Sequence, residues 1–187
     1  MELTVEEKKT LLEAARKSIQ LLFDKQKVPE PDFGKFPSLK SNAGAFVTIT
    51  KHGGLRGCIG YILSDKSLFT TVCEAAVQSA SNDPRFPPVG KNEVDKLAIE
   101  ISVLSPPFPL NSYDEIIVGK HGLILEEKGR RGLLLPQVPI EHHLNKEQYL
   151  DAICQKTGFT PGYWKTKQLQ LSGFTANVFS EEELENK

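Results

Sequence analysis

The chain has 187 residues, a net charge of −1 and the composition of an ordinary globular protein, with 39% hydrophobic and 25% charged residues. Such a chain can bury a core without disulfides or metals, and its near-zero charge offers no basic field for nucleic acid or an anionic membrane. No apolar run approaches the roughly 20 residues that cross a bilayer, and the N-terminus does not read as a signal peptide, so we expect a cytoplasmic protein with no membrane and no nucleic-acid partner.

The first predicted element is a helix from Thr4 to about Lys25. Thr4 and Glu7 match the capping box that starts many helices, and apolar residues follow at helical spacing. Prolines and a glycine then predict an irregular segment over 29–37. Three apolar side chains are expected to hold this segment against the core: Phe33, Phe36 and Leu39.

A hairpin, a helix and a strand are predicted next. Residues 43–50 and 55–62 are rich in strand formers and flank a His-Gly-Gly turn, which is typical of a hairpin. Apolar spacing predicts a helix from about 67 to 80. Residues 97–105 alternate between apolar and polar side chains, as a half-buried strand does.

The second half repeats this order. Residues 122–125 and 132–135 predict a hairpin around a charged turn. A helix is predicted from Asn145 to about Thr157, and a final strand over 169–179 precedes an acidic tail that we expect to fray.

Hairpin, helix and strand thus occur twice, over about 41–106 and 116–180, which suggests an internal duplication. Lys51-His52-Gly53 at the first hairpin turn is echoed by Lys120-His121-Gly122 at the second. The sequence therefore predicts an α+β fold with two hairpin-helix-strand repeats, antiparallel sheets and an N-terminal helix. We expect a single domain over 1–187.

The segment Leu-Arg-Gly-Cys-Ile-Gly, residues 55–60, contains the main candidate residues for a functional site. On a strand, Arg56, Cys58 and Gly60 share one face, so we expect the guanidinium to lower the pKa of the thiol. Gly57 and Gly60 indicate a bulge or a close backbone approach, and Gly60 would leave its face uncovered. A thiolate beside bare amides suits a nucleophile or an anion site. The alternative is that Cys58 packs as a small hydrophobe and that the glycines let a helix pack closely.

This segment resembles the signature of the AMMECR domain family, whose bacterial and archaeal members are called protein A of the AmmeMemoRadiSam system. Trp164 and four further blocks match the family pattern: Asp83–Val89, Glu100–Pro107, Gly119–Leu123 and Leu134–Val138. The segment Pro139–Leu144 departs from it, because family members tend to be more aromatic there. The resemblance covers nearly the whole chain.

The resemblance implies an α+β fold of two repeats but no reaction, since the family has no settled activity. Its prokaryotic members are found alongside a Memo-type protein and a radical-SAM enzyme. The resemblance therefore implies these two proteins as partners in a pathway or a complex.

Other polar residues extend the candidate site. Asp83 and Arg85 flank a proline, so the loop either presents Arg85 to an anionic ligand or is only fixed by an Asp83–Arg85 ion pair. Glu100 lies on the polar face of its strand and is either a general base or, as we favour, the partner of Arg56.

Two candidates lie in the second half. His121 is either the base for Cys58 or, as we favour, a surface histidine beside a turn. Gln137 follows a proline and is expected to donate hydrogen bonds to a ligand or a loop.

Metals and cofactors are not expected. The spacings of the three cysteines match neither a disulfide framework nor a zinc site. We expect Cys73 and Cys154 to be structural. The adjacent His142 and His143 are expected at the surface.

Three hypotheses of function follow. In the first, an enzyme uses Cys58 as a thiolate or redox thiol, with Glu100 and His121 managing the proton and a small anionic substrate held by Arg56, Arg85 and the amides around Gly57. In the second, the same cleft binds a ligand or a protein partner without catalysis. The third, nucleic-acid binding, is disfavoured by the charge. We favour a cleft with some chemistry.

Overall fold

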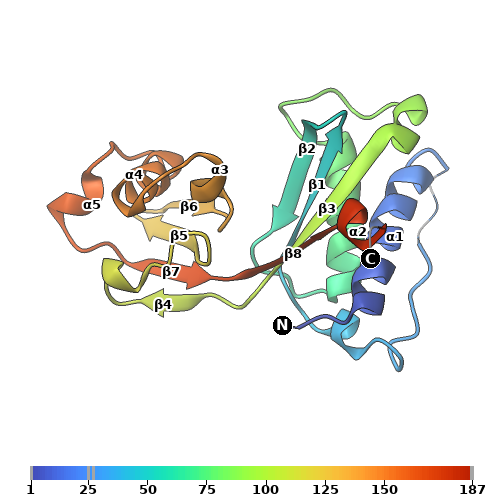
Figure 1. Ribbon diagram of the computed structural model, residues 1–187, viewed down its shortest axis with the longest axis horizontal. Helices are drawn as coiled ribbons and strands as arrows, with labels where there is room; N and C mark the ends of the chain where they lie inside the picture. Colours follow the sequence, from blue (N-terminus) through green and yellow to red (C-terminus); the bar gives the residue numbers. More distant parts are fainter. Residues whose placement is uncertain (1, 25, 27, 186–187) are drawn as a thin grey trace. The chain divides into compact units, whose positions relative to one another are not determined.

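The computed structural model describes residues 2–24, 26 and 28–185 (Figure 1). The chain forms two compact units. The first contains the segment up to Leu104 and the segment from Asn177 onward, and the second contains Ser105–Ala176. The second unit is therefore inserted into the sequence of the first.

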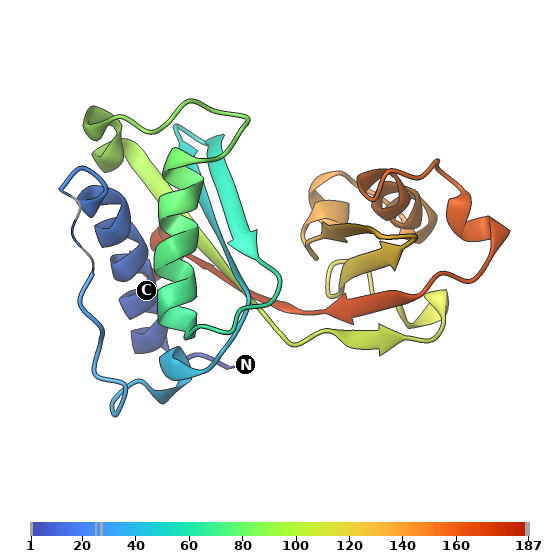
Figure 2. The same ribbon diagram turned by 180° about the vertical axis from the view of Figure 1, so that it is seen from behind.

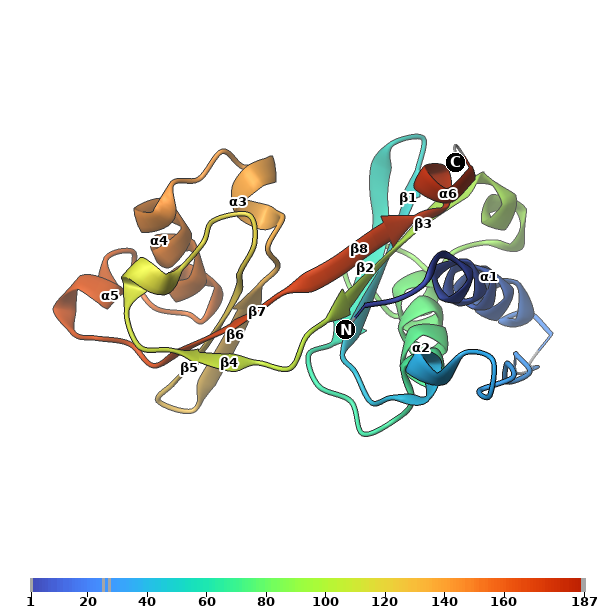
Figure 3. The same cartoon turned by 60° about the horizontal axis from the view of Figure 1, so that its bottom comes forward.

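The first unit is a four-stranded sheet with two helices on one face (Figures 2 and 3). Its strands, in the sheet order β2-β1-β3-β8, are β2 (Gly54–Tyr61), β1 (Ala45–Lys51), β3 (Leu97–Leu104) and β8 (Ala176–Ser180). The helices are α1 (Val5–Leu21) and α2 (Leu68–Ser81), and two short 3-10 helices cover Pro37–Lys40 and Lys91–Lys96. The core lies between this sheet and the helices, where the alternate residues Val47, Ile49, Ile99 and Ile101 are buried.

The start of α1 confirms the predicted capping box. The Thr4 hydroxyl accepts a hydrogen bond from the Glu7 amide at 3.2 Å, and the Glu7 carboxylate accepts one from the Thr4 amide at 3.0 Å. The helix ends at Leu21, earlier than predicted; Lys25, its predicted end, lies outside the described residues. Leu39 is buried, with Phe33 and Phe36 packed against the same core as predicted.

The second unit is also a four-stranded sheet with helices. Its strands, in the order β4-β7-β5-β6, are β4 (Phe108–Leu110), β7 (Leu171–Phe174), β5 (Gly122–Glu127) and β6 (Arg130–Leu134). The helices are α3 (Val138–Glu141), α4 (Lys146–Lys156) and α5 (Tyr163–Thr166), with a 3-10 helix over Tyr113–Glu115. Asn145 caps α4 as predicted, because its side chain accepts from the Gln148 amide at 2.9 Å. The Gln148 side chain completes a capping box that was not predicted.

The predicted repetition of hairpin, helix and strand is confirmed, because β2-β1-β3 and β6-β5-β7 have the same antiparallel order. His52-Gly53 and Lys128-Gly129 turn the two hairpins with positive φ at both residues, the geometry that matches the strand twist. The suggested counterpart of the first turn, at Lys120-His121-Gly122, was therefore wrong: those residues lead into β5. A single domain with repeats at 41–106 and 116–180 stays a prediction.

The predicted final strand over 169–179 was wrong, because it is two strands in two different sheets. The chain leaves β7 at Phe174 and enters β8 at Ala176. The acidic tail does not fray at its start, because helix α6 (Glu181–Glu185) follows. The Glu181 carboxylate pairs with the Arg16 guanidinium and accepts the Ile99 amide at 2.9 Å.

Among residues 2–24, 26 and 28–185, no helix is both long and apolar enough to cross a membrane.

Candidate functional site

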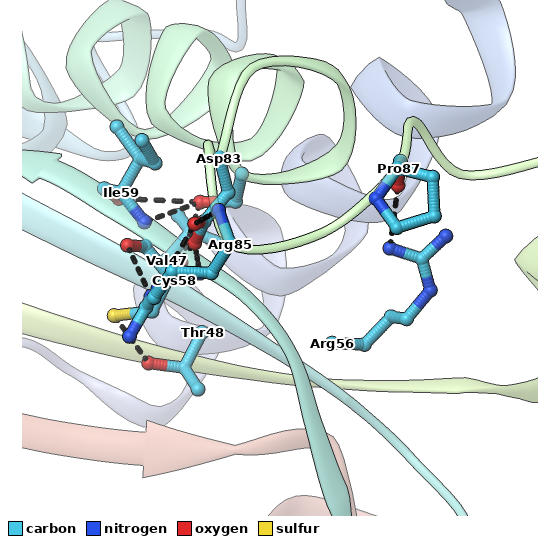
Figure 4. Close-up of polar contacts among 9 residues, drawn as sticks. Val47, Thr48, Arg56, Cys58, Ile59, Asp83, Arg85 and Pro87 are labelled. Atoms are coloured by element: carbon cyan, nitrogen blue, oxygen red, sulfur yellow. Dashed lines mark hydrogen bonds and ion pairs between the residues drawn. The ribbon is translucent and has the colours of Figure 1, made fainter.

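Cys58 lies on the face of the first sheet that points away from α1 and α2. In the antiparallel register it pairs with Thr48 of β1, and Thr48 pairs with Glu100 of β3. Paired residues of antiparallel strands share a face, so these three side chains form a row, called here the Cys58 row. The backbones of Cys58 and Glu100 are two strand spacings apart, roughly 10 Å. The Thr48 hydroxyl donates a hydrogen bond to the Cys58 sulfur at 3.3 Å (Figure 4).

The surroundings of Cys58 keep its thiol protonated. The side chain is half-buried, and this burial raises the pKa of the thiol above its ordinary value. The hydrogen bond from Thr48 and the charge of Arg85 lower the pKa, while the charges of Asp83 and Glu100 raise it further. The net direction is upward, so the predicted lowering of the Cys58 pKa by Arg56 was wrong.

Arg56 is turned away from Cys58 by a β-bulge. Ile49 pairs with Gly57 but Thr50 pairs with Leu55, which leaves Arg56 as the extra residue of β2. Leu55 therefore takes the face that Arg56 would share with Cys58 in a regular strand. The predicted neighbourhood of Arg56 and Cys58 was wrong for this reason.

The guanidinium of Arg56 instead ties down the loop before β3. It donates to the Pro87 carbonyl at 2.8 Å, as Figure 4 shows, and pairs with the Glu93 carboxylate at 3.1 Å. Glu93 also pairs with Lys51 at 2.7 Å. The Gly90 amide, followed by Lys51 and Arg56, lowers the pKa of Glu93 to about 2. The favoured partner of Arg56, Glu100, was thus wrong; the carboxylate is Glu93.

Both glycines of the segment are required by close packing. A Cβ on Gly57 would lie 2.1 Å from the Ser79 carbonyl oxygen of α2. A Cβ on Gly60 would lie 2.5 Å from the Phe46 ring and 2.3 Å from the Ala45 carbonyl oxygen. The prediction that Gly60 leaves its face uncovered was wrong, because the side chain of Phe46 occupies that space. The alternative of close helix packing is therefore confirmed for Gly57, whereas Gly60 makes room for strand β1 and the side chain of Phe46.

The amides on either side of Cys58 are also occupied. The Cys58 amide donates to the Asp83 carboxylate at 2.8 Å, and β2 is an edge strand. The Ile59 amide donates to the Ser79 hydroxyl at 2.7 Å, and that hydroxyl donates to the Val47 carbonyl of β1 at 2.7 Å (Figure 4). Asp83 thus protects an edge, and Ser79 bridges two strands. Neither amide is left to cradle an anion.

Asp83 orients Arg85 beside the Cys58 row. The Asp83 side chain is 3% exposed, and its carboxylate accepts Nε and Nη2 of Arg85 at 3.0 and 2.7 Å. The hydrogen bonds from Arg85 hold the pKa of Asp83 far below its usual range. The Arg85 side chain is nevertheless 54% exposed. The ion pair fixes the loop while the outer side of the guanidinium stays accessible.

His121 and Gln137 belong to the second unit. His121 is only 9% exposed, and its ring packs edge-on against Phe108 with 5.3 Å between centroids. The Ile117 amide donates to its Nδ1 at 3.4 Å, so the expected surface histidine was wrong. The Gln137 Oε1 is buried without a hydrogen-bond partner among the described residues. A catalytic role for His121 and a ligand role for Gln137 stay predictions.

Cys154 is buried and Cys73 is half-buried. No group of three or more His, Cys, Asp or Glu side chains within the described part of the chain is placed to hold a metal ion.

Sequence reasoning missed Thr48, Ser79 and Glu93. A regular two-residue hairpin at His52-Gly53 would pair Thr48 with Gly57, and only the bulge brings Thr48 opposite Cys58. Ser79 and Glu93 reach the segment from 20 and 37 residues away. Local sequence patterns do not predict contacts between residues so far apart in the sequence.

Comparisons with known proteins agree with the fold. The AMMECR1 family model matches residues 12–179. The protein Mbar_A1807 of Methanosarcina barkeri is 38% identical over 189 residues, which cover 97% of this chain and 93% of the relative. A protein of Thermococcus onnurineus is 40% identical over 182 residues, with 92% and 89% covered.

A solved structure supports the same assignment. The crystal structure of uncharacterized protein PH0010 from Pyrococcus horikoshii matches with a TM-score of 0.85 and 37% identity. The match covers 92% of this chain and 90% of that one. The α+β fold expected from the resemblance is confirmed, and the chain belongs to the AMMECR1 family.

Proposed function

We propose that the protein is a binding module whose ligand contacts are the Cys58 row and the guanidinium of Arg85. The observation that carries this proposal is the occupation of the groups that would activate the thiol. Arg56 is held by Glu93, and the Cys58 amide is held by Asp83. Burial raises the pKa of Cys58, so the thiol is a neutral contact group at pH 7.

The row offers several polar groups to a ligand. Thr48 contributes a hydroxyl, Glu100 a carboxylate and Cys58 a thiol, while Arg85 contributes outward-facing N–H donors. Asp83 already balances the charge of Arg85. A small free anion is therefore less well matched than a polypeptide segment that both accepts and donates hydrogen bonds. The ligand we propose is a segment of a partner protein.

The partners that the resemblance implies make the proposal testable. Purified Memo-type and radical-SAM proteins from the same organism would be tested for binding by pull-down and calorimetry. Arg85→Ala should weaken binding about tenfold or more, because an oriented arginine at the centre of an interface is a typical hot spot. Arg131→Ala, an exposed arginine of the second unit, is the matched control.

Folding must be separated from binding in this test, because removing Arg85 leaves the buried Asp83 carboxylate without its main partner. Cys58→Ser changes the row without touching that ion pair, and thermal unfolding of each variant shows whether it is folded. Equal binding by wild type, Arg85→Ala and Cys58→Ser would refute the proposed contacts.

Thiol chemistry is the second candidate, and the arrangement of the Cys58 row favours it. The Thr48 hydroxyl contacts the Cys58 sulfur at 3.3 Å, and Glu100 follows in the same row. In a displacement on a small anionic substrate, the sulfur would form a bond to carbon while the leaving group departs with its electron pair. The thiol proton would pass through a bridging water to the Glu100 carboxylate, because the backbones of the two residues are roughly 10 Å apart.

The pH dependence of Cys58 alkylation by iodoacetamide separates the two candidates. A raised pKa predicts a rate at pH 7 below that of free cysteine, rising with pH beyond the unperturbed pKa of about 8.5. Mass spectrometry reads Cys58, Cys73 and Cys154 in one sample. An apparent pKa below 8.5 would reject the neutral-contact role and favour the thiol enzyme.

A further inference from the structure

The turn of the β5–β6 hairpin presents two exposed cations of the second unit. Lys128 and Arg130 flank Gly129, and the positive φ at Lys128 and Gly129 makes the turn tight. Both residues are exposed, and neither forms an ion pair with any residue that the structure describes. Every residue of 105–176 is described, so the charges of the second unit are known in full.

Two stacked aromatic rings orient these cations. The rings of Phe159 and Tyr163 are parallel, with 4.5 Å between their centroids. The Arg130 guanidinium lies over Phe159, 5.2 Å from its centroid, and donates a hydrogen bond to the Gly158 carbonyl. The Lys128 ammonium lies over Tyr163, 5.7 Å from its centroid. A ring attracts a cation without neutralising its charge, so an incoming ligand meets two positive charges at defined places.

A structural role accounts for only part of this arrangement. Gly158 follows α4 with a positive φ, and a cation is favourable at the C-terminal end of a helix. Arg130 therefore caps α4, but its bond to Gly158 uses one of the five N–H donors of a guanidinium. The Lys128 ammonium contacts the Tyr163 ring but makes no hydrogen bond or ion pair with a described residue. Helix capping thus leaves the second cation unexplained.

The neighbouring charges select the kind of anion. Lys165 and Lys167 lie on and directly after α5, but Glu147 and Glu127 neutralise them at 3.0 and 2.9 Å. A nucleic acid binds along a row of unpaired cations that follows its phosphates, and this surface does not supply such a row. Two unpaired cations beside half-buried aromatic rings match two neighbouring carboxylates of a polypeptide, with the rings providing the apolar contact typical of protein interfaces.

We propose that this surface, formed by Lys128, Arg130, Phe159 and Tyr163 and called here the hairpin patch, docks an acidic segment of a partner protein. One carboxylate of the segment would meet the Arg130 guanidinium and a second would meet the Lys128 ammonium. Apolar side chains of the segment would lie against the exposed parts of the two rings. The hairpin patch shares no residue with the Cys58 row, so this inference does not depend on the function proposed above.

The test uses two short synthetic peptides that differ only in charge. One contains several glutamates and a tyrosine in a glycine-serine background, and the other has glutamine in place of each glutamate. Binding is followed by NMR titration of the isotope-labelled full chain, with the backbone amides of residues 128–132 as the local readout. The glutamate peptide should shift these amides at millimolar concentration, and added salt should weaken the effect because exposed charges are screened. The glutamine peptide should leave them in place.

The Lys128→Gln variant tests the charge without touching the cap of α4. It should weaken binding of the glutamate peptide about two- to fivefold, the range of an exposed ion pair, and Lys128→Glu should weaken it further. Lys120→Gln removes an exposed lysine at the opposite end of the hairpin and should have no effect.

Three outcomes would overturn the proposal. Equal shifts with both peptides would refute the preference for acidic groups. Tighter binding of oligothymidylate than of the glutamate peptide would replace the protein partner with single-stranded nucleic acid. Absence of shifts with the glutamate peptide up to about 10 mM would show that the hairpin patch is not a docking site.

Discussion

Removal of the Asp83 carboxylate should destabilise the first unit substantially. In Asp83→Ala, the Cys58 amide loses an acceptor 2.8 Å away on a sheet edge, and Arg85 loses two side-chain hydrogen bonds. A hydrogen bond to a buried charged group contributes about 1.5–3 kcal/mol. The exposed guanidinium can be solvated again, so its ion pair adds only about 0.2–1 kcal/mol. The expected loss in unfolding free energy is about 2–4 kcal/mol.

The same carboxylate should make this loss depend on pH. Its folded pKa lies below the unfolded value of about 3.9. The stabilisation is therefore complete above about pH 5 and is lost as the pH falls below 4 towards the folded pKa. The difference in unfolding free energy between wild type and Asp83→Ala should shrink over that range. Glu93 is present in both proteins, so its pH-dependent contribution to the unfolding free energy cancels in the difference between wild type and Asp83→Ala.

Urea denaturation followed by circular dichroism, at several pH values, measures this difference. Amide hydrogen exchange gives a local readout, because the Cys58 amide should lose protection in the variant. Asp65→Ala removes an exposed carboxylate from the loop before α2 and should stay within about 0.5 kcal/mol of wild type. A loss below 1 kcal/mol for Asp83→Ala, or a difference that stays constant with pH, would refute the reasoning.

Three further substitutions test the packing and the caps. Gly57→Ala places a Cβ 2.1 Å from the Ser79 carbonyl oxygen, and this overlap should cost about 3 kcal/mol or more in urea denaturation or prevent folding. Glu181→Gln removes the ion pair with Arg16 and should cost about 1–2 kcal/mol, with faster proteolysis of the C-terminal helix. Asn145→Ala removes the cap of α4 and should cost about 1 kcal/mol, seen as lower thermal stability of the second unit.

Each substitution has a control. Gly53→Ala meets no atom within 4 Å, so only its positive φ opposes the change, at about 1–2 kcal/mol. Glu183→Gln, the control for Glu181→Gln, alters an exposed position of α6 and should leave the unfolding free energy and the rate of proteolysis unchanged. Gln148→Ala removes the weaker half of the capping box, so it should cost less than Asn145→Ala. A Gly57→Ala protein as stable as Gly53→Ala would show that the helix moves aside without cost.

Elements with local signals could be predicted from the sequence. Thr4 and Asn145 have their capping partners three residues away. The strand at 97–104 could be predicted because its apolar and polar side chains alternate. The surroundings of Cys58 could not be predicted. A single extra residue at Arg56 exchanges the faces of the strand, and alternation alone does not reveal a bulge.

Contacts between residues that are far apart in the sequence could not be predicted either. The sequence from Leu169 to Phe179 has the character of one strand, but the chain changes sheets at Thr175. Which sheet a strand joins depends on the edges that other strands leave open, and those edges lie far away in sequence. The pKa of Cys58 depends in the same way on Asp83 and Arg85, which approach from another loop.

The nesting of one unit within the other has a consequence for synthesis on the ribosome. Ser105 and Thr175, at the two ends of the inserted segment, are joined by hydrogen bonds of 2.8 and 2.9 Å. The inserted segment can therefore close on itself as soon as it has emerged. The earlier-made part must wait for its fourth strand, β8, and for Glu181, which are made only after the inserted segment. Until then β3 has an open edge, and a nascent-chain chaperone would find its target in the half that was made first.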